Sequence, residues 1–195
     1  MISIDLNSVE VPFRWPEIFA EHAPIDIDIG AGKGRFLNEL ATSFPDRNFL
    51  AVERAHKYYK LCCDRVARRG LKNVRLICTT AEDLFFRLVE PESVDRIFVL
   101  FPDPWPKKRH HKRRFIKAEA VATMRRALKP GGQLLIKSDH DDYAEVIDEV
   151  VRSAKGFDLL DPDVIFKDLP VTGFELKYRI EGRSIHSFAL KKNDV

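Results

Sequence analysis

A chain of 195 residues with 45% hydrophobic side chains is long enough for one domain with a sizeable core and too short for two. Its formal net charge of +3 excludes a generally basic, histone-like protein, and no apolar run approaches the roughly 18 residues that a membrane-spanning helix needs. Three cysteines without a CxxC pair argue against a disulfide framework or a zinc site and favour a reducing cytoplasm, and the first residues lack the basic and apolar segments expected of a signal peptide.

After a lead-in over residues 1–24, strand-like and helical patterns alternate as far as residue 154. The predicted strands are short apolar runs: Ile25–Ile29, Asn48–Val52, Val74–Cys78, Val94–Leu100 and Gln133–Lys137. The predicted helices follow them: Lys33–Ser43, His56–Arg69, Ala81–Val89, Lys112–Leu128 and Asp141–Ala154. Strands that alternate with helices in this way predict a parallel sheet with right-handed crossovers.

The C-terminal part breaks this alternation. Residues 158–172 are rich in Asp and Pro and predict a long ordered loop. Phe174–Glu181 and Arg183–Leu190 resemble two strands joined at Gly182, which predicts an antiparallel hairpin at the sheet edge. We therefore expect a single α/β domain over residues 1–195, with a mostly parallel seven-stranded sheet, a C-terminal antiparallel hairpin and helices on both faces.

A glycine-rich turn follows the first predicted strand, in the order Asp28, Gly30, Gly32 and Gly34. Glycines let the backbone turn sharply and approach a ligand, and they expose N–H groups at the start of the next helix. The GxGxG spacing lacks the third glycine of the dinucleotide pattern GxGxxG, and Lys33 is followed by glycine rather than by the Ser or Thr of a P-loop. Alone, such a turn is structural as often as it is functional.

The next two predicted strands end in polar residues. Glu53 follows the second strand, where an acid can accept both ribose hydroxyls of an adenosine, although an exposed strand-end residue is the alternative. Thr80 and Ala81 follow the third strand, where they can contact the adenine, or Thr79 or Thr80 can cap the helix that starts at Ala81. Together with the glycine turn, these residues favour an adenosine cofactor without a large phosphate group.

Residues 101–114, FPDPWPKKRHHKRR, directly follow the fourth predicted strand. Asp103 lies between two prolines beside Trp105, at a strand end, which is where open α/β sheets bind ligands. The basic residues after it predict a phosphate-binding surface: Lys107, Lys108, Arg109, Lys112, Arg113 and Arg114. A carboxylate beside such residues favours chemistry on a nucleic acid over a solvated charge run, and we expect His110 and His111 at phosphates or on the surface rather than on a metal.

The DxGxGxG turn, Glu53 and the acid Asp103 resemble a class I S-adenosylmethionine-dependent methyltransferase. The FPDPWPKKRHHKRR segment, with Lys137-Ser-Asp139 and Thr172-Gly-Phe-Glu175, narrows the resemblance to the bacterial tRNA (guanine-N7-)-methyltransferase family, over residues 25–190. The resemblance implies a Rossmann-like fold, S-adenosyl-L-methionine as the cofactor, and tRNA as the substrate, with N7 of a variable-loop guanine as the methyl acceptor. It implies no metal and no membrane, and it leaves a monomer or a homodimer open.

The resemblance also implies roles for individual residues. Those that would hold the cofactor lie within a cofactor-binding core over residues 25–154: Asp28, Gly30, Gly32, Gly34, Glu53, Thr80, Ala81 and Asp103. Asp103 would also be the catalytic residue, facing both the cofactor and the base. A second set, completed by the loop and hairpin over residues 155–195, would contact the tRNA: Lys107, Asp139, Thr172, Gly173, Phe174 and Glu175.

Some of these assignments have structural alternatives. Asp139 can instead cap the following helix, Glu175 can instead be a solvent-facing strand residue, and the two residues before Glu175 can simply shape a turn. The chain also departs from the family pattern, because Thr80 stands where members often have Asp or Asn, and because no basic arm precedes Arg14.

Guanine N7 carries a lone pair and no proton, so its methylation needs no general base. It needs in-line alignment and a field that tolerates positive charge on the purine, which we expect Asp103 to supply. Three other functions stay open. A methyltransferase for a small molecule or a protein has no need of the basic run, a non-catalytic RNA-binding module would not bind the cofactor, and an NAD oxidoreductase is disfavoured by the GxGxG spacing.

Overall fold

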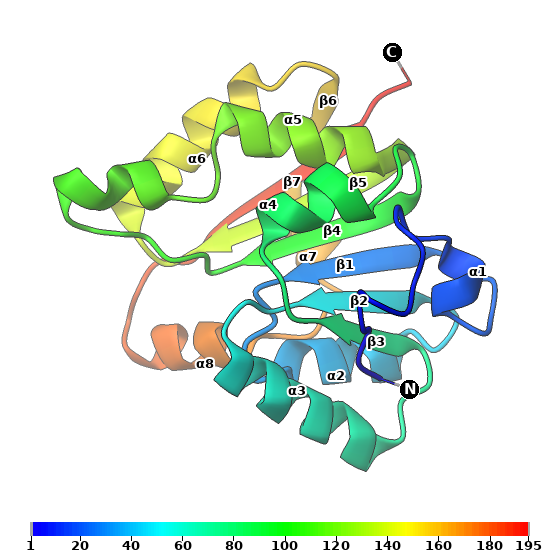
Figure 1. The fold of residues 1–195 in the computed structure, drawn as a ribbon. Helices are drawn as coiled ribbons and strands as arrows, with labels where there is room; N and C mark the ends of the chain where they lie inside the picture. The colour runs from blue at the N-terminus through cyan, green and yellow to red at the C-terminus, as the bar shows by residue number, and fades with distance from the viewer. Residues whose placement is uncertain (1, 195) are drawn as a thin grey trace.

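The computed structural model describes residues 2–194, whose centre is a seven-stranded sheet in the order β3-β2-β1-β4-β5-β7-β6 (Figure 1). Strands β1 to β5 pair in parallel, and β7 is inserted antiparallel between β5 and β6. The strands are β1 Ile25–Ile29, β2 Asn48–Val52, β3 Val74–Ile77, β4 Val94–Leu100, β5 Leu128–Ser138, β6 Phe157–Leu160 and β7 His186–Lys192. The predicted sheet, mostly parallel with an antiparallel C-terminal pair, is confirmed.

Helices cover both faces of this sheet, as predicted. Helices α4, α5 and α6 lie on one face, and α2, α3 and α8 lie on the other (Figure 1). The helical segments are α1 Trp15–Ile18, α2 Arg35–Ser43, α3 His56–Arg69, α4 Ala81–Asp83 with the π-helical turn η1 Leu84–Leu88, the 3-10 helix η2 Lys108–Arg113, α5 Ala118–Ala127, α6 Asp141–Ser153, α7 Pro162–Phe166 and α8 Gly173–Ile180. Within residues 2–194, none of them has the length and apolar character needed to cross a membrane.

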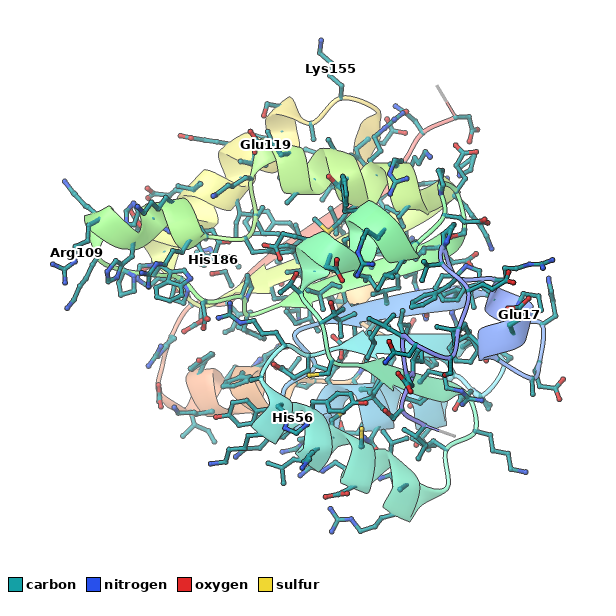
Figure 2. All side chains as sticks on the ribbon, viewed as in Figure 1. Glu17, His56, Arg109, Glu119, Lys155 and His186 are labelled. Carbon is teal, nitrogen blue, oxygen red and sulfur yellow. The ribbon has the colours of Figure 1, made fainter. Side chains whose placement is uncertain are left out.

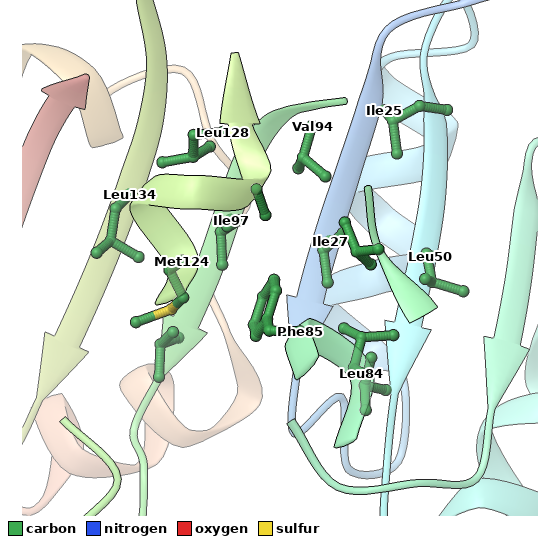
Figure 3. Close-up of a cluster of buried hydrophobic side chains, with 14 of the residues drawn as sticks. Ile25, Ile27, Leu50, Leu84, Phe85, Val94, Ile97, Met124, Leu128 and Leu134 are labelled. Atoms are coloured by element: carbon green, nitrogen blue, oxygen red, sulfur yellow. The ribbon is translucent and has the colours of Figure 1, made fainter. Parts of the chain in front are cut away.

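The two faces of the sheet carry separate apolar cores, because successive strand residues point to opposite faces. In β4, Ile97 and Val99 pack in the core formed with α5 and α6, whereas Phe98 packs in the core formed with α2 and α3. Figure 3 shows the first of these cores, whose members include Ile27, Leu50, Leu84, Phe85 and Met124. Since both faces of the central strands are covered, their carboxyl ends are the edge at which a site can open.

The C-terminal segment differs from the prediction in two places. Residues Phe174–Glu181, expected as the first strand of the hairpin, instead form most of helix α8 and its C-cap, Glu181. Thr172 caps the first turn of this helix by accepting a hydrogen bond from the backbone N–H of Glu175 at 2.9 Å. The predicted loop over residues 158–172 contains most of strand β6 and the helix α7. The predicted antiparallel pair is therefore present, but its first strand is β6 rather than the segment that forms α8.

The helix predicted over Lys112–Leu128 is shorter than expected. It begins at Ala118, because the residues before it form η2 and then an extended segment in which Arg114 is buried. It ends before Leu128, which starts β5 by pairing with Val94. The basic run therefore lies outside α5, on a segment of its own.

Candidate active site at the carboxyl edge of the sheet

The glycine turn after β1 has a left-handed backbone at each glycine, with φ of +74° at Gly30, +56° at Gly32 and +71° at Gly34. Residues with a side chain rarely adopt this conformation. Packing adds a second requirement at Gly34, because a Cβ there would lie 2.3 Å from Sγ of Cys62 on α3. The turn therefore packs directly against α3, and no larger residue fits at its last position.

Two acidic side chains meet beside this turn. Glu53, after β2, is 8% exposed and accepts hydrogen bonds from the backbone N–H groups of Gly32 at 2.9 Å and Ala55 at 2.7 Å. Asp28, in β1, is 4% exposed, and no hydrogen-bond donor within residues 2–194 reaches its carboxylate. Burial, and then the nearby charge of Glu53, raise the pKa of Asp28 to about 7.

A nearly buried carboxylate that no protein donor reaches is free to accept hydrogen bonds from a ligand. Asp28 therefore fits a small molecule that carries ammonium or hydroxyl groups. Glu53, by contrast, already fixes the glycine turn through Gly32, so a ligand that takes its oxygens must compete with backbone N–H groups.

Thr80 and Ala81 follow β3 at the start of α4. The Thr80 hydroxyl accepts a hydrogen bond from the backbone N–H of Asp83 at 3.1 Å, so the capping role that the sequence left open is confirmed. Thr80 is also exposed, and both residues line a hollow of about 690 Å³ between α4 and α5, which Phe86 and Phe115 line as well. The cap therefore leaves Thr80 open to a ligand.

Asp103 is exposed on a loop with an unusual backbone. Phe101 and Trp105, on either side of it, have φ of +58° and +45°, which costs each of them about 1–3 kcal/mol. Arg114 holds this loop, since it is 4% exposed and its Nε donates to the carbonyl oxygen of Pro104 at 2.8 Å. The loop is therefore fixed from behind while the Asp103 carboxylate faces solvent.

Arg114 is itself fixed by α6. Its Nη2 donates to Asp142, and its guanidinium carbon lies 4.8 Å from the ring centroid of Tyr143. The Tyr143 hydroxyl in turn accepts a hydrogen bond from the backbone N–H of Ile116 at 2.9 Å. The prediction that Arg114 belongs to the phosphate-binding residues is wrong, because its side chain is buried and its donors serve the loop.

The other basic residues of the run are exposed on and beside η2: Lys107, Lys108, Arg109, Lys112 and Arg113. Figure 2 shows Arg109 at the far end of this helix, where it points away from the body of the molecule. Trp105 supports η2, because Arg113 lies 4.8 Å over its ring and His110 meets its edge at 5.8 Å. The segment therefore presents cations to solvent directly after Asp103.

Asp139, after β5, accepts a hydrogen bond from Nη1 of Arg183 at 2.7 Å. The alternative that it caps α6 is wrong, because the N-cap residue of that helix is His140, without a side-chain cap. Arg183 lies between α8 and β7, so the pair ties the C-terminal segment to the carboxyl end of β5.

Glu175 lies in the first turn of α8 and is 1% exposed. Its carboxylate accepts hydrogen bonds from Nζ of Lys137 at 2.8 Å and from Nη2 of Arg179 at 2.6 Å. Lys137, at the end of β5, is also buried, with its Nζ 4.4 Å from the ring centroid of Phe166. The alternative of a solvent-facing strand residue is therefore wrong, and Glu175 holds α8 against β5.

The three residues before Glu175 start α8 in different environments. Thr172 is 5% exposed and serves as the cap. Gly173 faces Arg35, whose Cδ would lie 3.4 Å from an added Cβ, and Phe174 is 56% exposed. Phe174 therefore presents the largest exposed side chain of this segment.

Lys137 and Tyr178 have no predicted role of their own, although Lys137 belongs to the Lys137-Ser-Asp139 motif. A charged residue at the end of an apolar run was the available indication for Lys137, since a buried lysine requires a partner. The sequence pattern predicts a strand at Tyr178. In a helix it lies four residues after Phe174 on the same face, and the Thr172-x-x-Glu175 spacing of a capping box was the indication for that helix.

Comparison with known proteins identifies the family. Residues 22–188 match a protein-family profile described as "Putative methyltransferase". The tRNA (guanine-N(7)-)-methyltransferase of Syntrophotalea carbinolica is 32% identical over 190 residues, which cover 96% of this chain and 82% of that protein. The protein of the same name from Pseudomonas putida is 34% identical over 191 residues, which cover 96% of this chain and 80% of that protein.

Solved structures agree in fold. The 16S rRNA methyltransferase KamB matches with a TM-score of 0.62 at 18% identity, over 91% of both chains. An rRNA methylase from Streptococcus thermophilus matches with a TM-score of 0.56 at 17% identity, over 88% of both chains. At such identities the structural likeness confirms the Rossmann-like methyltransferase fold alone. The family is shown by the profile match and the sequence relatives: the chain belongs to the tRNA (guanine-N(7)-)-methyltransferase family.

Proposed function

We propose that this protein transfers the methyl group of S-adenosyl-L-methionine to N7 of a guanine in the variable loop of tRNA, giving 7-methylguanosine. The position of Asp103 supports this most directly. It is an exposed carboxylate on a fixed loop after β4, the strand next to β1 with its buried Asp28, and exposed cations follow it in the chain. A site for a small adenosine ligand and a surface for a polyanion thus adjoin at one carboxylate.

The residues at the ends of β1, β2 and β3 fit this cofactor. No hydrogen-bond donor of the described residues reaches the nearly buried carboxylate of Asp28, and the ammonium group of an amino acid would supply one. Glu53 has the position from which a carboxylate accepts ribose hydroxyls, and the turn Gly30–Gly34 would lie under the amino-acid end. Thr80 and Ala81 would meet the adenine. S-adenosyl-L-methionine supplies a sulfonium methyl group, whose bond to sulfur breaks with both electrons left on sulfur as the bond to guanine N7 forms.

Asp103 suits the charge that this reaction moves. No side chain has to remove a proton, because N7 attacks with a lone pair, and positive charge develops on the purine. A carboxylate already fixed by its loop stabilises that charge without reorganising. We expect Asp103→Asn to lower kcat by about 10²–10³-fold while tRNA affinity is retained. Single-turnover kinetics at saturating tRNA measures this, and full turnover with normal tRNA binding would contradict the role.

The tRNA would be bound in two ways. Exposed cations around η2, Lys107 among them, supply affinity through phosphates without sequence choice. Selection of one guanine requires the shape of the tRNA and an unstacked base. We infer that Asp139 and the start of α8 supply this part, with Thr172 and Glu175 holding the helix so that Gly173 and Phe174 face the RNA. Residues 25–154 then bind the cofactor, and residues 155–195 complete the substrate site.

A tRNA substrate implies a cytoplasmic enzyme. The three cysteines, Cys62, Cys63 and Cys78, are free thiols, as a reducing compartment favours. In this proposal the tRNA-binding surface and the cofactor site lie on one chain, which is compatible with a monomer or a homodimer.

The test is methyl transfer from labelled S-adenosyl-L-methionine to unmodified tRNA, followed by digestion and identification of the nucleosides. We expect 7-methylguanosine, and we expect it to disappear with a tRNA whose variable-loop guanine is replaced by adenine. A different methylated nucleoside would retain the fold and overturn the substrate. No transfer by a protein that binds both cofactor and tRNA would overturn the proposed reaction.

A further inference from the structure

Three aromatic rings form one cluster beside the Asp103 loop. The ring of Tyr178 on α8 meets the edge of Phe101 at 5.6 Å between centroids, with an interplanar angle of 60°. It also stacks with Phe174 at 5.9 Å and 26°. Phe101 belongs to the same fixed loop as Asp103, so the cluster connects that loop to α8, which lies beside the carboxyl ends of the strands (Figure 1).

Charged groups surround this cluster. The guanidinium carbon of Arg183 lies 4.5 Å from the ring centroid of Tyr178, while its Nη1 donates to Asp139. Burial raises the pKa of the Tyr178 phenol, the charges of Asp139 and Asp103 raise it further, and Arg183 lowers it. Both carboxylates are therefore within electrostatic reach of the ring, and the phenol stays neutral at physiological pH.

The cluster is supported on one side and open on the other. Phe174 is 56% exposed, and Tyr178 and Phe101 are partly exposed. Neighbouring exposed aromatic rings make a contiguous apolar patch, and such patches mark contact surfaces more often than single exposed side chains do. Tyr178 packs behind Phe174 and against Phe101, so the exposed ring face is held in place before any ligand arrives.

We propose that Phe101, Tyr178 and Phe174 form a stacking site for the purine that is methylated, with Tyr178 as the positioning residue that fixes the other two rings. The inference rests on the proposed function and adds residues to it. A base splayed out of an RNA loop loses its stacking partners and recovers them on aromatic side chains. The methylated purine also carries positive charge, and an aromatic ring attracts a cation. The rings and Asp103 therefore stabilise the same charge as it develops.

Replacement of the Tyr178 ring tests this site. We expect Tyr178→Leu, which keeps apolar volume, to lower the single-turnover rate at saturating cofactor and tRNA by roughly tenfold or more. The Kd for tRNA should change by less than about twofold, because phosphate contacts dominate affinity. Tyr178→Phe keeps the ring and should restore the rate. Ile180→Ala is the matched control, since Ile180 is 87% exposed on the same helix.

Several outcomes would overturn the stacking site. A wild-type single-turnover rate for Tyr178→Leu would do so. So would a Tyr178→Phe protein as slow as Tyr178→Leu, or an Ile180→Ala protein whose rate falls as far as that of Tyr178→Leu. If Tyr178→Leu fails to fold, Phe174→Leu carries the same expectation, because its exposed position tolerates the change. Failure of the proposed function is a separate result, since the wild-type protein would then make no 7-methylguanosine.

Discussion

Arg114→Met removes the guanidinium that holds the Asp103 loop and keeps an apolar stem of similar length. The change leaves the carbonyl of Pro104 without its 2.8 Å hydrogen bond, worth about 1.5–3 kcal/mol for a charged donor. It also removes the cation–π contact with Tyr143, worth roughly 0.5–2 kcal/mol. Phe101 and Trp105 can then relax from their left-handed conformations, which offsets part of this loss. We expect a net destabilisation of about 2–4 kcal/mol.

Catalysis should suffer more than stability in this variant. A released loop no longer holds the Asp103 carboxylate in place, so the rate of methyl transfer at saturating cofactor should fall by about 10²-fold. Urea unfolding measures the first effect, and single-turnover transfer at a temperature where the variant is folded measures the second. Arg152→Met is the matched control, because Arg152 is exposed and pairs with Asp148 at 2.6 Å within α6. A fully active Arg114→Met protein would refute the anchoring argument.

Three further predictions concern the two binding regions. Gly34→Ala should lower the free energy of unfolding by about 2–5 kcal/mol, because of its positive φ and because the new Cβ clashes with Cys62. In a double-mutant cycle, Cys62→Ala should recover the part of this loss that comes from the clash. Simply additive effects of the two substitutions would contradict the clash. Lys107→Ala with Lys108→Ala should weaken tRNA binding and reduce its salt slope by about 1–2 while cofactor affinity is unchanged, whereas an equal loss of both affinities would indicate misfolding. The folded pKa of Asp28, about 7, exceeds the unfolded value near 3.9, so the folded state binds more protons between them and stability falls as pH rises from about 4 to 7. Asp28→Asn should therefore gain on the order of 4 kcal/mol at pH 8 and nothing near pH 4 in urea unfolding, and a gain independent of pH would contradict this assignment.

The parallel part of the sheet could be predicted because each strand is buried on both faces and therefore appears as an apolar run between helical patterns. β1, β2 and β4 occur at the predicted residues. β6 could not be found in the same way, since Asp158 and Leu159 of this edge strand are exposed and its apolar pattern is weak. Its identity as a strand depends on β7, whose residues are distant in sequence.

The error at α8 has a different cause. Phe174–Glu181 contains aromatic and β-branched residues that favour strands, yet a local cap at Thr172 and the ion pair of Glu175 with Lys137 stabilise a helix. The ion pair joins residues far apart in the chain, which no local pattern reveals. Arg114 was misassigned for a related reason, because its neighbours in the sequence are exposed cations and only its three-dimensional contacts with Pro104 and α6 distinguish it.

The insertion of β7 between β5 and β6 has a consequence for synthesis. β6 leaves the ribosome before β7, but its strand partner in the sheet is β7, so it stays unpaired until β7 emerges. Until then the edge of β5 is also open and able to pair with other chains. β7 closes this edge by pairing with Gln133–Ser138 of β5, and Lys192 at its end adds a hydrogen bond from Nζ to the carbonyl of Leu128 at 2.7 Å. An emerging chain therefore contains the residues proposed for the cofactor site well before its sheet is complete. A translational pause after residue 160 would prolong the time during which the unpaired edge of β5 can aggregate with other chains.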